Sequence, residues 1–224
     1  YQNIDTCSGF GMAYNLYNSQ SEWLENLINF LRSEYFFNSI AELFDIPVQP
    51  YRTAGGCHKY LSGYEISPHP DSRNKALTYM ININPNPQSE QEKHHTHYMT
   101  LKKQYEYVST YWEGNPDIDR SWLPWGWCNT KFMHNKNNSI VIFSPNNKTI
   151  HAIKSNYNDF KYQRTQFYGN LWYEGYPKLL RPSWSSLNIC PQDEVTTGSF
   201  AWKIRNKLDN AAEKLSNYIK DCVA

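Results

Sequence analysis

Ser67-Pro68-His69-Pro70-Asp71 stands shortly before the strand-like run Ala76-Leu77-Thr78-Tyr79-Met80-Ile81-Asn82-Ile83. His69 and Asp71 are two residues apart, and residues at that spacing in a β-strand point to the same side. One imidazole nitrogen and one carboxylate oxygen can therefore reach a single point in space. Two such ligands make only a weak site for a divalent metal, so a complete site needs a third.

The candidate for the third ligand is His151, which lies 80 residues after Asp71 and follows a second apolar run at 139–143. Two histidines and one carboxylate on one face of a metal, with the other positions open, form the facial triad of non-haem Fe(II) oxygenases. The competing interpretation is that His69 and Asp71 belong to an ordinary turn and that His151 is a partly buried histidine with satisfied hydrogen bonds.

The order His69-x-Asp71, a long gap, His151 and then a basic residue resembles the Fe(II)/2-oxoglutarate-dependent dioxygenases. The similarity covers residues 60–173 and points to the prolyl 4-hydroxylase-like branch. This resemblance implies that His69, Asp71 and His151 hold Fe(II). Members that halogenate lack the carboxylate, so the resemblance with Asp71 present implies hydroxylation.

The resemblance also implies a set of residues for the cosubstrate. Arg164, 13 residues after His151, matches the residue that pairs with the distal carboxylate of 2-oxoglutarate. A planar guanidinium suits that role because it binds a carboxylate bidentately. Lys161 competes with it, since some members use a lysine at a shorter spacing. Tyr60, Thr78 and Asn82 occupy places where the family often has further cosubstrate-binding residues.

Short strands with turn signals at intervals of about ten residues predict a β-sandwich or barrel. With the resemblance, the expected fold class is mainly β with flanking helices (α+β), built on a double-stranded β-helix, or jelly roll. We expect one domain over 1–224, in which 1–50 form a helical N-terminal layer, 51–175 form the core and 199–224 form a C-terminal helix.

Local signals place the other elements. Ser19 or Ser21 is expected to cap a helix that runs through Leu31, because the apolar residues follow helical spacing and acidic residues occupy the first turn. A second helical piece is expected over 38–44, and Gly55-Gly56 is expected to form a turn.

Residues 85–124 carry the cluster His94-His95-Thr96-His97 and several aromatic residues, and we expect them to form an insertion that could contact substrate. The histidine cluster could bind metal by its composition. It has no acidic partners at a firm spacing, so a solvated polar loop is the favoured interpretation.

The 224-residue chain has a net charge of +1 and an aromatic content of 16%. A net charge this close to zero creates no strong electrostatic attraction, so we expect the protein to bind neither nucleic acid nor a membrane surface. Five scattered cysteines without a CxxC motif indicate a reducing compartment, and no apolar run has the length of a membrane span. We expect a cytoplasmic protein, and the sequence leaves its oligomeric state open.

The activity implied by the resemblance is hydroxylation of an aliphatic C–H bond, with Fe(II) and 2-oxoglutarate as cofactors and ascorbate as a reductant in vitro. The substrate partner would be a peptide or a small molecule, such as a prolyl residue or a free amino acid. Two other classes stay open. One is a cupin-like metal enzyme that does not use 2-oxoglutarate, and the other is a non-catalytic β-sandwich that binds a ligand. The direction of the Arg164 side chain and a metal analysis separate these classes.

Overall fold

The computed structural model describes residues 9–10, 13–16, 19–47, 51–61, 63–153, 162 and 164–184. The chain divides into two compact units, Tyr1–Ser183 and Trp184–Ala224. The fold described below is that of the first unit. The helix expected over 199–224 and the competing cosubstrate residue Lys161 lie outside the described residues.

Ten strands form two five-stranded antiparallel sheets in the described part of the chain. The first sheet has the order β1-β4-β9-β6-β7, with bounds Gly9–Phe10, Glu65–His69, Ile150–Ile153, Thr96–Leu101 and Cys128–His134. The second has the order β2-β3-β10-β5-β8, with bounds Ala13–Asn15, Tyr51–Tyr60, Arg164–Tyr173, Lys75–Asn82 and Ser139–Phe143.

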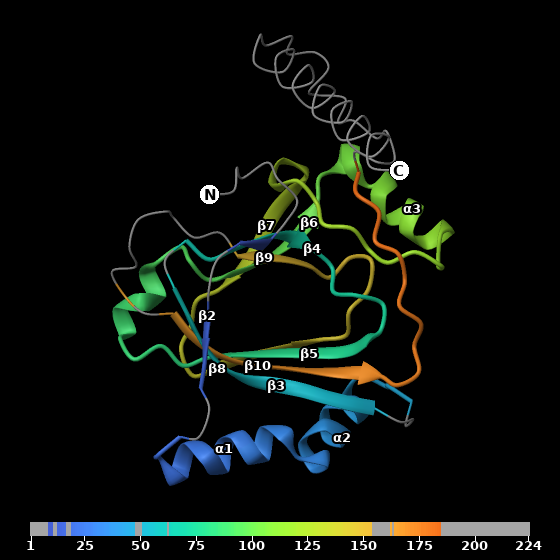
Figure 1. Ribbon diagram of the computed structural model, residues 1–224. Coiled ribbons are helices and arrows are strands. Elements are labelled where there is room, and N and C mark those ends of the chain that lie inside the picture. The colour runs from blue at the N-terminus through green and yellow to red at the C-terminus, as the bar shows by residue number, and fades with distance from the viewer. Residues whose placement is uncertain are drawn as a thin grey trace, which may run out of the picture. The chain divides into compact units, whose positions relative to one another are not determined.

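The two sheets lie one above the other, and the chain passes repeatedly between them (Figure 1). It goes from β3 in the second sheet to β4 in the first, back to β5 and across again to β6. Strands that are distant in sequence therefore become neighbours, as β4 and β9 do. The predicted class is confirmed at the level of a mainly β protein with antiparallel sheets and a few helices.

Two helices, α1 (Glu22–Arg32) and α2 (Glu34–Leu43), cover the outer face of the second sheet (Figure 1). The predicted N-cap is confirmed for α1, because the Ser21 hydroxyl accepts a hydrogen bond from the backbone N–H of Leu24. The second helix begins four residues earlier than expected because Ser33 caps it through the N–H of Phe36. Shorter helices complete the unit: η1 Pro87–Gln91, η2 Lys103–Tyr105, α3 Tyr107–Gly114 and η3 Trp125–Trp127.

The side chains of β5 and β10 alternate between two faces of the second sheet. One face packs against the helices in the hydrophobic core, and the other faces the first sheet. Leu77 and Tyr79 pack with residues of α1 and α2 in one hydrophobic cluster, which also contains Phe167 of β10. Because side chains alternate along a strand, Thr78 on β5 and Arg164 on β10 point to the opposite face. That face looks toward the first sheet, so the polar residues of these strands gather between the sheets.

Gly55 and Gly56 lie inside β3, so the turn expected there is wrong. Gly55 pairs with Gly169 of β10, and a Cβ atom at Gly55 would stand 2.6 Å from the backbone oxygen of Tyr168. The absence of a side chain allows this close approach of two strands, which is another common reason for a glycine pair besides a turn.

The histidine-rich segment is not a solvated loop, so that expectation is also wrong. His94 and His95 are buried, with His95 at 0% exposure. The segment leads directly into β6, which lies between β9 and β7 inside the first sheet. The central part of 85–124 is therefore a core strand. Its register is set by pairing with β9 and β7, which are distant in sequence.

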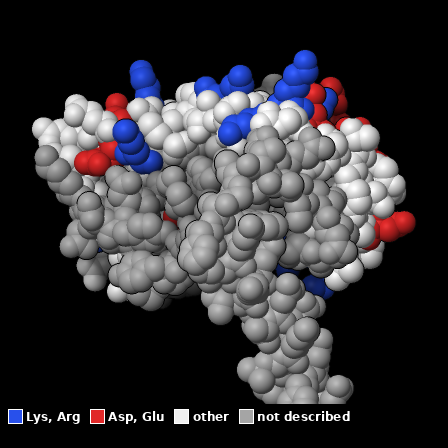
Figure 2. All heavy atoms as spheres, turned by 90° about the horizontal axis from the view of Figure 1, so that it is seen from above, with Lys and Arg blue, Asp and Glu red and all other residues white. Residues whose placement is uncertain are grey.

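Among the described helices, none has the length and apolar character needed to cross a membrane. The face shown in Figure 2 carries both basic and acidic side chains on its described part.

We expect Gly55→Ala to lower the free energy of unfolding by about 1–3 kcal/mol, because the added methyl group meets backbone atoms that cannot rotate away. Urea unfolding measures this value. Gly114→Ala is the matched control, since a Cβ atom there meets nothing within 4 Å. Equal stability of the two variants would show that β3 and β10 do not approach as closely as described.

Candidate metal centre

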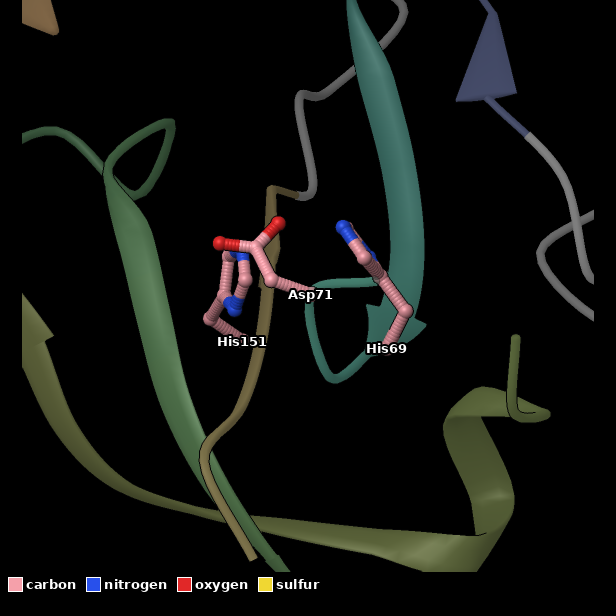
Figure 3. Close-up of side chains that lie close together, drawn as sticks. All are labelled: His69, Asp71 and His151. Atoms are coloured by element: carbon pink, nitrogen blue, oxygen red, sulfur yellow. The ribbon is translucent and has the colours of Figure 1, made fainter. Parts of the chain in front are cut away.

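The pairing of β4 with β9 places His69 directly opposite His151. The centroids of the two imidazole rings are 4.5 Å apart. Asp71 follows β4 by two residues, and its carboxylate turns back toward the two rings (Figure 3). One ligand atom from each of the three residues lies within 4.8 Å of the others. The structure thus brings together the three residues that the sequence indicated as metal ligands.

The carboxylate of Asp71 is held at both oxygens. The Thr78 hydroxyl donates to Oδ2 over 2.7 Å, and the Lys75 ammonium lies 2.7 Å from Oδ1. Thr78 Oγ1 is also 3.0 Å from the side-chain amide of Asn170. A hydroxyl has one proton, so we assign Asn170 the orientation in which its NH₂ group donates to Thr78. Thr78, expected to bind the cosubstrate, therefore orients Asp71 in this structure.

Asp71 is 5% exposed, and its charge state follows from its neighbours. Burial raises the pKa of its carboxyl group, but His151, Lys75 and His69 together outweigh burial and bring the pKa below its usual range. The group is therefore a carboxylate at neutral pH. An anionic oxygen donor is the form in which aspartate binds a divalent metal.

Both histidines present the neutral form that binds a metal. Burial lowers the pKa of His69 to about 3, with a further contribution from His151 and an opposing one from Asp71. Burial also lowers the pKa of His151. His69 Nδ1 lies 2.7 Å from the carbonyl oxygen of Ser67, so Nδ1 carries the proton and Nε2 is left with a lone pair. A hydrogen bond from the outer nitrogen to a carbonyl commonly orients a metal-binding imidazole.

Arg164 begins β10 in the second sheet, yet its Nη2 donates over 3.0 Å to Thr96 Oγ1 of β6 in the first sheet. Its side chain therefore crosses the space between the sheets. Thr96 precedes Tyr98 by two residues, and Tyr98 pairs with His151. Along β6 the guanidinium is thus about 7 Å from the level of the triad, at a rise of ~3.4 Å per residue.

The guanidinium of Arg164 is almost completely buried, at 1% exposure. Its Cζ lies 4.1 Å from the centre of the Tyr60 ring. Burial lowers its pKa, but the group stays a cation at neutral pH because its usual pKa is so high. Among the described residues, no carboxylate lies within 4 Å of it, and its Nε and Nη1 have no hydrogen-bond partner. A buried cation without an anion is costly, so this position favours an anionic ligand.

Gln166 links Asn82 to Arg164, and it also bonds Tyr60, whose ring contacts the guanidinium directly. The amide oxygen of Gln166 accepts from the Tyr60 hydroxyl and from Arg164 Nη2, and its NH₂ group donates to the side-chain oxygen of Asn82. Asn82 also donates to the carbonyl oxygen of His134. Tyr60 and Asn82 thus support the guanidinium, and their direct binding of a cosubstrate stays a prediction.

Tyr98 belongs to the same region and was missed from the sequence. Its ring lies 6.3 Å from that of His151. Burial raises the pKa of its hydroxyl, the charge of Arg164 lowers it and that of Asp71 raises it. The phenol therefore lies within electrostatic range of both the triad and the guanidinium. Only the position of β6 next to β9 could reveal this, and the sequence carries no signal for it.

Two buried histidines lie near the guanidinium. His95 Nε2 is 2.7 Å from the carbonyl oxygen of Ser89, so Nε2 carries the proton of the neutral ring. His134 Nε2 is 2.8 Å from Ser139 Oγ, whose own proton goes to the carbonyl oxygen of Lys136. Burial lowers the pKa of both rings, and the charge of Arg164 contributes in each case. Both are therefore neutral inside the fold at pH 7.

No family model and no curated protein matches the sequence. The chain is similar to several solved structures, of which two are described. An oxidoreductase of the 2OG-Fe(II) oxygenase family from Burkholderia pseudomallei is 10% identical with a TM-score of 0.37, and the match covers 66% of this chain and 56% of that protein. A prolyl-4-hydroxylase from Pseudomonas putida is 11% identical with a TM-score of 0.41, and the match covers 75% of this chain and 74% of that protein. Scores at this level do not establish a shared function, so the chemistry rests on the side chains.

We expect Asp71→Asn to weaken the binding of a divalent metal at least tenfold, because an anionic donor becomes a neutral amide. A calorimetric titration of the protein with Co²⁺ measures the dissociation constant. Asp117→Asn, an exposed change outside the triad, is the control. Unchanged Co²⁺ affinity in Asp71→Asn would remove Asp71 from the ligand set.

We expect the metal-free protein to lose stability as the pH falls below about 6.5. Burial lowers the folded-state pKa of His94 to about 3 and of His95 to about 4, both below the unfolded value of 6.5. Between these limits the unfolded chain binds more protons than the folded one, so protonation favours unfolding. Urea midpoints measured from pH 7.5 to 5 should fall steadily. His95→Gln should reduce the slope, and a flat profile in the wild type would contradict the burial of these rings.

Proposed function

We propose that this protein is an Fe(II)- and 2-oxoglutarate-dependent oxygenase that hydroxylates an aliphatic C–H bond. The observation that carries the proposal is the pairing of two features inside one fold. A His-Asp-His cluster with metal-ligand spacing lies between the sheets. The buried guanidinium of Arg164 contacts β6 at Thr96, two residues before the residue that pairs with His151, and it has no carboxylate partner among the described residues.

The donor set fits the metal. Two neutral imidazoles and one carboxylate are the ligand types of the facial triad, which leaves positions open for other ligands. The residues that would hold the iron are His69, Asp71 and His151. When bound, the iron and 2-oxoglutarate would supply the activation of dioxygen.

Arg164 fits the cosubstrate. A dicarboxylate needs one cation for the carboxylate that lies away from the metal, and Arg164 offers a buried fork with two unused donor positions. Tyr60 stacks against the guanidinium and Gln166 accepts from it, so the fork is held in place before any ligand arrives. The inward direction of Arg164 also weighs against a cupin-like enzyme that does not use 2-oxoglutarate.

The strand order supports a double-stranded β-helix as the finer description of the fold. In each sheet, four strands alternate between early and late parts of the chain: β3-β10-β5-β8 in one and β4-β9-β6-β7 in the other. Such interleaving is the winding of a jelly roll. We propose this architecture, with the triad between its two sheets.

The protein's own residues have three tasks in this proposal. His69, Asp71 and His151 fix the metal, and Thr78 and Lys75 orient the carboxylate. Burial of these groups excludes water, so that electrostatic interactions with a bound ligand are stronger than in solvent. The substrate would be a prolyl residue of a peptide, a free amino acid or another small molecule.

The test is succinate formation from 2-oxoglutarate with added Fe(II) and ascorbate, first without substrate and then with a panel of proline-containing peptides and free amino acids. Turnover that depends on the metal supports the class, and a hydroxylated product identifies the substrate. Lack of bound metal and of 2-oxoglutarate turnover would instead favour a non-catalytic binding module.

We expect Arg164→Met to raise the KM for 2-oxoglutarate by about 10- to 100-fold, because a charge-assisted hydrogen bond contributes about 1.5–3 kcal/mol. Co²⁺ affinity should change little, since Arg164 is not a ligand. Arg52→Met is the control, because Arg52 is an exposed arginine of the same sheet whose side chain lies over Trp172. A wild-type KM in Arg164→Met would assign the cosubstrate to another residue.

A further inference from the structure

One short segment runs along residues 68–73, which comprise the end of β4 and the turn after it and carry two of the three candidate metal ligands. Residues 68–73 are called the ligand loop here. The short segment, residues 118–123, is called the strap here. It follows α3 and precedes η3, so it comes from the part of the chain that the sequence indicated as an insertion. Its contacts are with residues 68–73 on one side and 180–182 on the other.

The strap meets the ligand loop in antiparallel order. The N–H of Leu123 donates to the carbonyl oxygen of Pro68 over 2.6 Å. The ring of Trp122 lies 5.7 Å from that of His69. Further back along the strap, Arg120 Nη1 donates to the carbonyl oxygen of Asp71 over 3.0 Å.

Asp119 completes this series of contacts. Its Oδ1 accepts from the backbone N–H groups of Arg73 and Arg120, at 3.0 and 2.9 Å. Leu123 uses its backbone N–H, Arg120 its guanidinium and Asp119 its carboxylate. Together these contacts fix the path of the chain from 68 to 73. The turn between His69 and Asp71 lies inside that path.

The other side of the strap is anchored. The N–H of Asp119 donates to the carbonyl oxygen of Leu180 over 2.7 Å, and its Oδ2 forms an ion pair with Arg181 over 2.7 Å. Ser121 Oγ donates to the carbonyl oxygen of Pro182. The strap is therefore held from both sides, and its contacts can hold the ligand loop in one position.

Arg120 is the unusual member of the strap. It is 5% exposed, and among the described residues no carboxylate lies within 4 Å of its guanidinium, whose Nε has no partner. Burial lowers its pKa to about 10, so it is still a cation at neutral pH. An apolar side chain would fill this place at a lower cost of desolvation. The use of arginine here is explained by its donor to the Asp71 carbonyl.

We propose that Arg120 is a positioning residue that sets the affinity of the metal centre, by fixing the backbone of Asp71 so that its carboxylate and His69 converge. This inference rests on the metal site of the proposed function, and it assigns no ligand role to Arg120. Residues that orient metal ligands from outside the ligand set typically change metal affinity by 10- to 100-fold when removed.

The test compares Arg120→Met and Arg120→Lys with the wild type in titrations with Co²⁺. We expect Arg120→Met to bind Co²⁺ at least tenfold more weakly, and its visible absorption bands at saturating metal to shift because the carboxylate approaches the metal differently. Arg120→Lys keeps a donor for the same carbonyl and should recover part of both losses. Arg32→Met, an arginine that bonds Gly55 on the other sheet, is the matched control and should match the wild type.

Circular dichroism and urea unfolding check that each variant is folded. If Arg120→Met does not fold, Arg120→Gln decides the question, because it keeps a polar side chain but is too short to donate to the carbonyl oxygen of Asp71 as Arg120 does. Wild-type affinity and an unchanged Co²⁺ spectrum in the folded variant overturn the inference, as does a wild type that binds no Co²⁺. These titrations use no 2-oxoglutarate. A wild type that binds Co²⁺ but does not turn over 2-oxoglutarate would contradict the proposed function and leave the role of Arg120 standing.

Discussion

The antiparallel pairing of β4 with β9 is the constraint on which the rest of the site depends. It sets His69 opposite His151, two residues that are 82 positions apart in the chain. Backbone hydrogen bonds fix this register, and a slip by one residue would turn one imidazole to the other face of the sheet. The flanking strands β1 and β6 hold the pair inside the sheet. Convergence of the two rings therefore follows from the ladder itself.

The site also depends on how charged groups are placed in a buried region. Asp71 is balanced by Lys75 through an ion pair, whereas Arg164 faces the interior with no described acid beside it. The two groups thus differ in kind. The first is a carboxylate that Lys75 compensates and keeps ionised, and the second is a buried cation without an acidic partner among the described residues. This asymmetry supports the proposed anionic cosubstrate, whereas the fold alone does not, because folds of one type serve many functions.

The polar residues between the sheets form connected chains of hydrogen bonds. Gln166 joins Tyr60, Arg164 and Asn82, and Thr78 joins Asp71 to Asn170. Such networks hold side chains in one rotamer, and a site needs that order to bind metal and cosubstrate in fixed positions. The strap adds the same order to the ligand loop from outside the sheets. Residues with no direct part in chemistry therefore account for much of the site's geometry.

The sequence by itself determined the helix capped at Ser21, the strand after Asp71 and the three residues of the candidate metal centre, because capping, alternation and ligand spacing are local signals. It placed the start of the second helix four residues too late, because the cap at Ser33 was not recognised. Only the tertiary structure decided that Gly55 lies in a strand, that His95 is buried, that Tyr98 pairs with His151 and that Arg120 donates to the carbonyl oxygen of Asp71. Each of these depends on which strand or segment lies alongside. That choice is made by long-range pairing, which no local pattern encodes.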